Sequence, residues 1–291
     1  MRSPVKHMDW MKREVIAAAG LRETYPDMPA DAAMPFARGH TARLLSPARL
    51  VIPGENPGNA MASATGFVST AADLARFMAQ LSPDAERSVL SADSRREMVK
   101  QVWNDPASGV VRNYSLGVYG SKPSGIDNFG HIGAFQGTIT RTAMLPELGV
   151  SISVLTNAID GPAVLWVEAL IRIVQRFHQA GAPPADRADW TGRWWGLWGA
   201  IEIVALGEKI VTFNPAFDLP FAEASEITLS DADNGVVTNA PGFDRFGEHV
   251  HRARDAGGAV TRIQIGGAGF VSEDLAKAQM QKRYGMQVAA E

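Results

Sequence analysis

One histidine of the chain stands where little side-chain bulk surrounds it. In the stretch NFGHIGAFQGT, residues 128–138, His131 lies between Gly130 and Gly133, just before a segment with the pattern of a strand. A histidine in such a place can offer a hydrogen-bond donor or a positive charge to a ligand, and the glycines leave room for that ligand. The same residues also fit a turn that a histidine caps. The residue types alone leave both interpretations open.

A second pair of residues has the spacing of a nucleophile and its base. Ser3 and Lys6 are three positions apart, so on a helix the lysine amine could take the proton of the serine hydroxyl while the serine attacks a carbonyl carbon. A match this short carries little weight without its structural context. Ser3 as a helix N-cap, with Pro4 at the first helical position, explains the same residues without any chemistry.

His249 and His251 are the remaining pair with a spacing that could serve a site. Separated by one residue, they would face the same side of a strand and could together hold a metal. No third ligand is evident near them in the sequence, and solvent-facing positions on a strand explain them equally well. We therefore predict no metal site and no cofactor.

Composition limits the classes of function. The 291 residues are 46% hydrophobic, which suffices for one large domain or two ordinary ones. A net charge of −3, with no run of Lys or Arg, argues against a nucleic-acid partner. The lack of cysteine excludes disulfides and a thiol nucleophile. No secretory signal and no apolar run of about 18 residues is present, so we expect a soluble chain without a membrane span, with cytoplasm and periplasm both open.

The elements that must position these residues change from helix to sheet along the chain. Thr70 and Asp73 have the spacing of a capping box at the start of an amphipathic helix. Periodicity and turn signals predict, in order, helices over 10–21, 70–81 and 91–102, a strand over 114–120, strands over 135–145 and 149–158, and a helix over 162–177 that covers the sheet. The fold class is therefore α+β.

A proline-rich stretch, 178–189, separates this region from a second one. Short alternating segments broken by Gly, Asp and Asn follow it, and they predict an antiparallel sheet that closes on itself. Four tryptophans open this region, and we expect them to plug the core of a small barrel rather than to form a ligand platform; they are Trp190, Trp194, Trp195 and Trp198. The charged run 277–283 predicts a solvated helix face or tail.

Five stretches give the chain a resemblance to a known family. They are AAAGLRETYPDMP, GFVSTAADLARFM, YSLGVYG, FGHIGAFQG and AMLPELGVSISVLTNA. Together they resemble the C-terminal two thirds of the β-lactamase-related serine hydrolases, which include class C β-lactamases, D-alanyl-D-alanine carboxypeptidases, D-aminopeptidases and esterases. The resemblance implies a partial β-lactamase/transpeptidase-like domain over 1–180, a linker over 181–187, and a lipocalin-like barrel over 188–285 of the kind that many members carry.

The resemblance also gives His131 a role. A Lys/His-x-Gly motif on a central strand of the family matches His131-Ile132-Gly133. By this resemblance His131 supplies a donor or a positive charge toward the substrate, and Gly133 keeps side-chain bulk out of the cleft. The backbone N–H of Ala134 is then one of the two donors of an oxyanion hole.

Two further motifs of the family have no convincing counterpart. They are Ser-x-x-Lys, which supplies nucleophile and base, and Tyr-x-Asn or Ser-x-Asn; no Tyr or Ser of this chain is followed two residues later by Asn. Ser3 and Lys6 stand too close to the GLRET stretch at Gly20 to fit the family order. We therefore expect a truncated, split or degenerate member that is nearly inactive alone. The alternative is a catalytically dead homologue that binds a peptide, a cell-wall fragment or a partner protein.

Missing N-terminal strands would leave the segment 149–158 at the edge of the sheet. It is apolar and contains no lysine or proline that would discourage strand pairing. We therefore predict a homodimer, or pairing with an N-terminal segment. The substrate stays open between a β-lactam, a D-amino-acid peptide and an ester.

Overall fold

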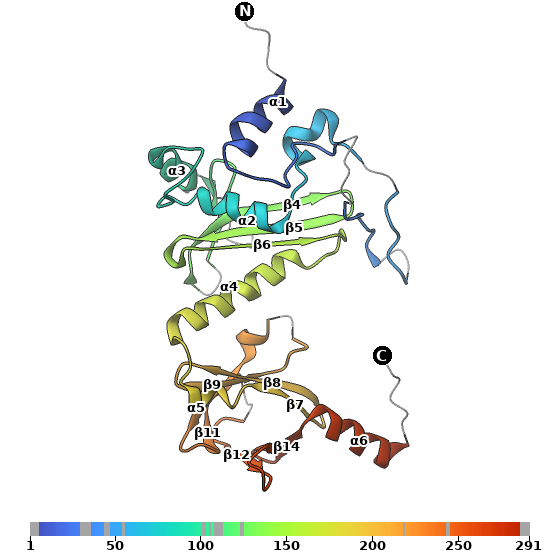
Figure 1. Cartoon of the computed structure of the whole chain (residues 1–291), viewed down its shortest axis with the longest axis vertical. Helices are drawn as coiled ribbons and strands as arrows, with labels where there is room; N and C mark the ends of the chain where they lie inside the picture. Colours follow the sequence, from blue (N-terminus) through green and yellow to red (C-terminus); the bar gives the residue numbers. More distant parts are fainter. Residues whose placement is uncertain are drawn as a thin grey trace, which may run out of the picture. The chain divides into compact units, whose positions relative to one another are not determined.

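The structure is a computed structural model that describes residues 6–29, 36–43, 47–53, 56–100, 103–104, 106–107, 113–122, 125–217, 219–242 and 245–285. The chain divides into two compact units, Met1–Ile171 and Arg172–Glu291. Figure 1 shows helices and a sheet in the first unit and a strand-rich second unit. The predicted α+β class, with a central antiparallel sheet followed by a closed antiparallel barrel, is confirmed.

The helices of unit 1 follow the predicted order with shifted ends. They are α1 (His7–Met11), η1 (Lys12–Ala17), η3 (Asn59–Met61), η4 (Ala62–Gly66), α2 (Ala71–Gln80), α3 (Ala92–Val99) and the start of α4 (Ala163–Ala180). The first predicted helix begins at His7, earlier than expected, and α3 ends before the predicted residue 102, which lies outside the described residues.

The helix α2 forms one of the two hydrogen bonds of the capping box that its sequence predicts. The hydroxyl of Thr70 accepts the Asp73 N–H at 3.3 Å, which satisfies one free donor of the first turn. The Asp73 carboxylate does not return the bond; it accepts the N–H of Glu23 at 2.7 Å and the hydroxyl of Thr24 at 2.9 Å. The acid therefore fastens α2 to the chain that leaves η1.

Six antiparallel strands form the sheet of unit 1. In sheet order they are β1 (Trp103–Asn104), β2 (Asn113–Tyr114), β3 (Tyr119–Ser121), β4 (Asn128–Phe135), β5 (Thr138–Leu145) and β6 (Val150–Thr156). As predicted, the last strand lies at the edge, with β5 as its strand partner among the described residues.

Two strand predictions were wrong in the same way. YSLGVYG is not one strand but a hairpin, in which Tyr114 of β2 pairs with Tyr119 of β3. The predicted strand 135–145 is also two strands, because Gln136 and Gly137 turn the chain with φ of 39° and 81°. Two successive residues with positive φ form the type I′ turn that joins twisted strands. His131 therefore lies inside β4, not before a strand.

Helices cover both faces of this sheet. The helix α2 packs over β5 and β6, and its Met78 joins Phe129 and Met144 in one apolar cluster. On the opposite face α4 places Val167 and Ile171 against the β5 side chains, as the amphipathic pattern of 162–177 predicted. The sheet is thus the rigid layer that carries β4.

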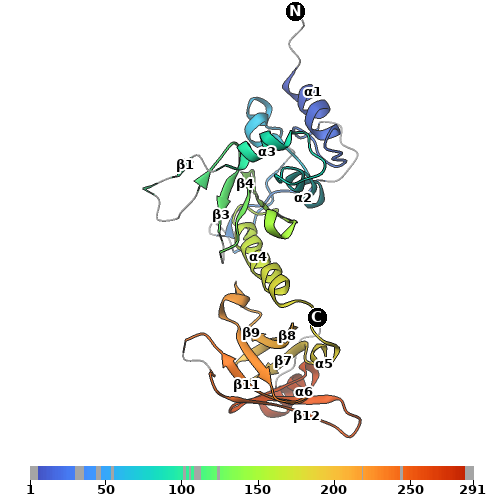
Figure 2. The same cartoon turned by 90° about the vertical axis from the view of Figure 1, so that its left-hand side faces the viewer.

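Unit 2 is a closed eight-stranded antiparallel barrel (Figure 2). Its strands are β7 (Gly192–Gly196), β8 (Gly199–Leu206), β9 (Lys209–Phe213), β10 (Ser225–Leu229), β11 (Asn234–Asn239), β12 (His249–Arg254), β13 (Val260–Ile265) and β14 (Ala268–Val271). The short α5 (Ala185–Ala188) precedes them, η7 (Pro220–Glu223) lies between β9 and β10, and α6 (Glu273–Tyr284) follows. The predicted solvated helix over 277–283 is confirmed, since α6 buries none of its side chains.

The expectation that all four tryptophans plug the barrel is right for one and wrong for another. Trp190 is 1% exposed within the barrel core, and its indole N–H donates to the Ala232 carbonyl at 3.1 Å. Trp198 is 85% exposed, because it sits in the turn between β7 and β8, where no neighbouring strand can cover it. Trp194 packs against the core while partly exposed, and Trp195 is partly exposed.

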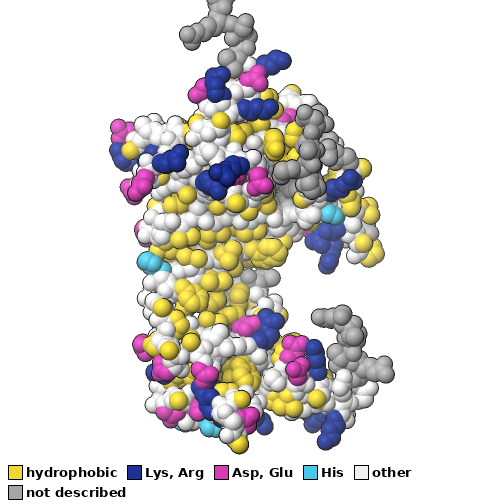
Figure 3. All heavy atoms as spheres, in the orientation of Figure 1, with side chains coloured by type: hydrophobic (Ala, Val, Ile, Leu, Met, Phe, Trp, Pro, Cys, Tyr) yellow, Lys and Arg dark blue, Asp and Glu magenta, His cyan; other side chains and the backbone are white. Residues whose placement is uncertain are grey.

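Unit 1 exposes apolar side chains around β6 and the start of α4. Figure 3 shows hydrophobic side chains gathered over these two elements. Leu155, Ile159, Trp166 and Leu170 are among the exposed large residues there. Among the described helices, none combines the length and the apolar character of a membrane span.

Candidate functional site

The strand β4 places His131 on the face of the sheet that α2 also covers. Side chains alternate along a strand, so Phe129, His131 and Gly133 share one face. Their cross-strand partners on β5 are Met144, Thr142 and Thr140. Phe129 and Met144 lie under α2, whereas the His131 side chain is exposed beyond it. The His131-Ile132-Gly133 motif thus begins where the cover of α2 over this face of the sheet ends.

Both ring nitrogens of His131 have hydrogen-bond partners. Nδ1 lies 2.6 Å from the Ile132 carbonyl oxygen, which can only accept, so Nδ1 carries the proton. In the neutral ring Nε2 is then an acceptor, and the Tyr114 hydroxyl donates to it at 3.1 Å. The arrangement holds the imidazole in one tautomer and directs Nε2 toward the phenol.

Two tyrosines flank His131, and the sequence analysis did not select them. The ring of Tyr114 lies 6.0 Å from the imidazole and that of Tyr119 lies 5.8 Å from it, both edge-on. The signal was present in YSLGVYG, because a four-residue turn brings residues 114 and 119 directly opposite each other. Reading the stretch as one strand separated them and hid the pair.

A buried arginine supports this group from the other face of the sheet. Arg141 is buried on β5, and burial lowers the pKa of its guanidinium while Tyr119 and Glu168 act in the opposite direction. The guanidinium lies 4.5 Å from the centroid of the Tyr119 ring and donates to Asn128 Oδ1 at 3.0 Å. Tyr119 thus contacts Arg141 on one side and His131 on the other. We assign Arg141 as a residue that positions the tyrosine.

Side chains are excluded at Gly130 and at Gly133 by different neighbouring atoms. A Cβ at Gly130 would lie 2.0 Å from the Thr142 carbonyl oxygen and 2.9 Å from the Arg141 guanidinium, so a side chain there would displace the buried arginine. At Gly133 a Cβ would lie 2.5 Å from Thr140 Oγ1. The missing side chain at Gly133 therefore makes room for a neighbouring hydroxyl on the same face as His131.

Ala134 lies on the part of β4 that has a free edge. In a two-residue hairpin the flanking residues, Phe135 and Thr138, form a hydrogen-bonded pair, and the direction of the backbone groups alternates from there. The N–H and C=O of Ala134 and Ile132 then point away from β5. On that side β3 pairs only with Asn128 to Gly130, so among the described strands none pairs with the edge from His131 to Phe135.

The other predicted pairs do not join this group. Ser3 lies outside the described residues, so its role stays a prediction. Lys6 precedes α1, where its carbonyl accepts the Trp10 N–H at 3.1 Å. His249 and His251 are exposed on β12, and Nδ1 of His251 bonds Asn234 Oδ1 at 2.8 Å. Within the described ranges no three acidic or histidine side chains are placed to hold a metal ion together.

An antiparallel sheet with helices on both faces is consistent with a β-lactamase-like domain. The family model described as Beta-lactamase matches residues 8–168, which is more than half of the chain. The chain therefore belongs to the β-lactamase family.

The solved structures that match the chain share little sequence with it. A penicillin-binding protein homologue from Pyrococcus abyssi is 14% identical, with a TM-score of 0.47, covering 92% of this chain and 60% of that one. A D-stereospecific amidohydrolase from Streptomyces sp. is 24% identical (TM-score 0.44; 55% and 47% covered), and a D-amino acid amidase from Ochrobactrum anthropi SV3 is 19% identical (0.46; 58% and 51%). The chain thus spans less than two thirds of each structure. No curated protein sequence matches the chain.

Proposed function

We propose that the chain is the C-terminal part of a serine hydrolase that acts on amide or ester bonds. The observation that carries the proposal is the His-x-Gly segment on β4 beside a strand edge without a strand partner, in a chain of the β-lactamase family. In this proposal residues 1–180 form the hydrolase-type domain, 181–187 a linker and 188–285 a lipocalin-like domain.

Each residue of the segment has a role in this proposal. A substrate lies along the free edge of β4, and the Ala134 N–H donates to the oxygen that becomes negative as the carbonyl is attacked. His131 faces the substrate as a hydrogen-bonding group or, once protonated, as a positive charge. Gly133 adds no side chain to the face on which the acyl group lies, so that bulk stays out of the cleft.

The nucleophile and its base come from outside this group. In the described part of the chain, the hydrogen-bond and ring-contact partners of His131 are Tyr114, Tyr119 and the Ile132 carbonyl, none of them a serine or a lysine. In comparable serine hydrolases the nucleophile and base carry most of the rate, whereas oxyanion donors and binding supply the remainder. The 291-residue chain by itself is therefore nearly inactive.

The alternative function is binding without catalysis. Two tyrosine rings and a histidine whose nitrogens are already hydrogen-bonded favour it, because stacking surfaces next to a free strand edge suit a peptide that adds as an extra strand. Such a module would hold a peptide, a cell-wall fragment or a partner protein.

Covalent labelling separates the two functions. We expect the purified chain to form no adduct with a fluorescent penicillin or a fluorophosphonate. Translation of the DNA upstream of Met1 should reveal an in-frame Ser-x-x-Lys followed by Tyr-x-Asn, and the longer protein should label at that serine. An upstream region without these motifs would favour the binding module. Labelling of the 291-residue chain that Ser3→Ala abolishes would instead make Ser3 the nucleophile.

A further inference from the structure

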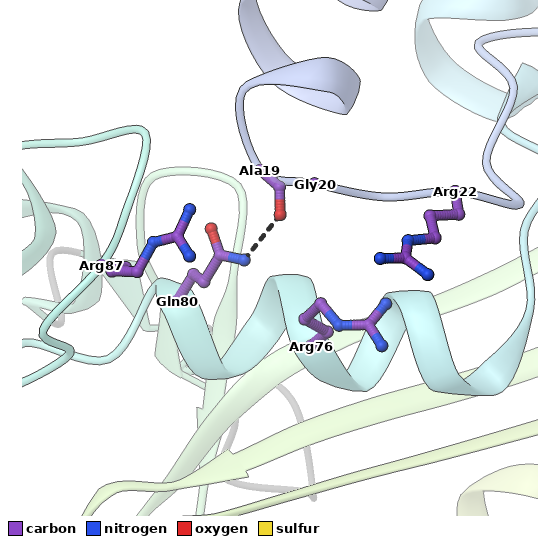
Figure 4. A pocket seen from close by; sticks show the side chains of 6 residues that line it. All are labelled: Ala19, Gly20, Arg22, Arg76, Gln80 and Arg87. Carbon is purple, nitrogen blue, oxygen red and sulfur yellow. Dashed lines mark hydrogen bonds between the residues drawn. The ribbon is translucent and has the colours of Figure 1, made fainter.

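A pocket of unit 1 away from β4 is lined by three arginines. Its volume is about 480 Å³, and its lining residues are Ala19, Gly20, Arg22, Arg76, Gln80 and Arg87. They come from three segments: the chain that leaves η1, the helix α2 and the loop that follows α2. Figure 4 shows the guanidinium groups of Arg22 and Arg76 turned toward each other, with Arg87 beside Gln80.

Hydrogen bonds of Gln80 and of the buried Asp73 fix the helix α2 and the η1 exit on two sides of the pocket. Gln80 donates from Nε2 to the Ala19 carbonyl at 2.8 Å, which links α2 to the η1 exit. Asp73 receives backbone N–H groups of Arg22 and Glu23, and its other oxygen pairs with the Arg76 guanidinium at 2.5 Å. One carboxylate therefore fixes both the backbone that carries Arg22 and the side chain of Arg76.

The charge of the pocket is not balanced by its own residues. None of the lining residues is acidic, and Asp73 offsets one of the three guanidinium charges. In the part of the chain that the structure describes, neither the Arg22 nor the Arg87 side chain has a hydrogen-bond or ion-pair partner. Cations that converge in one pocket repel each other, and a bound anion turns this repulsion into attraction.

We propose that this pocket binds a small doubly charged anion, a phosphate group or a dicarboxylate. The planar fork of a guanidinium matches the oxygens of phosphate and carboxylate with two parallel hydrogen bonds. Two uncompensated arginines equal the charge of such a dianion. The site is independent of β4, because no lining residue belongs to the His131 group.

Binding of two probes to the purified chain tests the proposal. Isothermal titration with inorganic phosphate and with succinate, at constant ionic strength and with chloride as the monovalent comparison, should give saturable binding of at least one dianion. Phosphate binding alone would identify a phosphate site, and succinate binding alone a dicarboxylate site. Arg22→Gln and Arg87→Gln should each weaken the bound dianion by about tenfold or more, because each removes a charge-assisted contact.

Controls separate a site from general charge attraction. Arg96→Gln removes an exposed arginine of α3 outside the pocket and should leave the affinity unchanged. The dianion should raise the melting temperature of the parent but not of Arg22→Gln, whose fold is checked by its circular dichroism spectrum. No saturable binding of either probe, equal binding of chloride, or an equal loss in Arg96→Gln would overturn the proposal. None of these measurements depends on hydrolase activity.

Discussion

The sheet of unit 1 and the barrel of unit 2 are both antiparallel, yet they treat their edges in opposite ways. In the barrel β9 pairs with β10 and β14 with β7, so that every one of its eight strands has two neighbours. In the sheet β6 has β5 as its strand partner in the described chain, and half of β4 has an open edge. Closure removes edges that could recruit another strand. The barrel thus has no open edge, whereas the described part of the sheet keeps edges with which another strand can pair.

The arginines of the two units show the same difference. In the barrel Arg252 and Arg254 are both paired with Asp189 and Asp233. Hydrogen bonds from Arg254 hold the pKa of each of these two carboxyls below its usual range. In unit 1 the pocket around Arg22 has one carboxylate for three guanidinium groups. The paired arginines of the barrel thus contribute to its fold, whereas the unpaired arginines of the pocket are the basis of the proposed anion binding.

The largest expected effect is on the barrel. The Arg252 side chain is 1% exposed, lies 4.1 Å from the Trp190 ring and donates to the carbonyl of Ala232 at 2.8 Å. Arg252→Ala should lower the free energy of unfolding by about 3–5 kcal/mol, because it removes several charge-assisted hydrogen bonds and leaves a cavity beside Trp190. Asp189 and Asp233 each lose one of their two arginine partners and keep Arg254.

Urea unfolding followed by tryptophan fluorescence reports on this change, since four of the seven tryptophans lie between residues 190 and 198. The matched control is Arg193→Ala, which removes an exposed ion pair with Glu202 on the barrel surface and should have little effect. Equal losses in both variants would show that the buried cluster is not what stabilises the barrel.

A smaller effect is expected at Asp73 of unit 1. Burial acts to raise the pKa of this carboxyl, but the Glu23 N–H, the Thr24 hydroxyl and Arg76 outweigh it and hold the pKa below its usual range. A depressed pKa contributes stability above the unfolded value of about 3.9, and that stability is lost as pH falls through the folded pKa. Asp73→Asn should therefore cost about 2 kcal/mol at pH 7, and this difference should shrink below about pH 4.

Thermal unfolding between about pH 2 and about pH 8 measures this dependence, because this range includes pH values below and above the unfolded pKa of about 3.9. Asp93→Asn, at an exposed acid of α3, is the control and should unfold like the parent at each pH. A difference between Asp73→Asn and the parent that stays constant to the lowest pH would contradict the assignment.

The smallest effect is on association through β6. Leu155 is exposed on this edge strand, and a lysine there should discourage pairing with a second strand. If the 31.2 kDa chain forms dimers, Leu155→Lys should weaken them by about tenfold in light scattering. Leu197→Lys, in the turn between β7 and β8, adds the same charge away from a free edge and should not. A parent chain that is a stable monomer would show that the edge is already protected.

Long periodic patterns predicted the fold well, and short turns did not. The apolar residues of α2 and α4 repeat at helical spacing over several turns. Several short segments of unit 2 likewise alternate between apolar and polar residues. A pattern with many repeats predicts an element more reliably than a single turn residue does. The turn at Gln136 uses a residue type that seldom adopts positive φ, so no turn signal marks the end of a strand at Phe135. Because of that error, His131 was predicted to lie before a strand, whereas it lies inside β4.

The candidate site was predicted at its motif but not in its surroundings. His131 and Gly133 were recognisable because the family motif is contiguous in sequence. Tyr114, Tyr119 and Arg141 come from other strands, and only the register of the sheet brings them to His131. The arginine pocket was missed for the same reason, since its cations are spread over residues 22–87.

The most direct test of the proposed function restores the missing motifs. The chain is fused to an N-terminal segment of a family member that carries Ser-x-x-Lys and Tyr-x-Asn, and kcat/KM is measured for a D-amino-acid amide, an ester and a penicillin. We expect hydrolysis of at least one substrate, and a loss of about 10- to 1000-fold in His131→Ala, since one group at a developing oxyanion is worth a few kcal/mol. His249→Ala, at an exposed histidine of the barrel, should retain full activity. An active fusion in which His131→Ala stays within about twofold of the parent would contradict the role of His131.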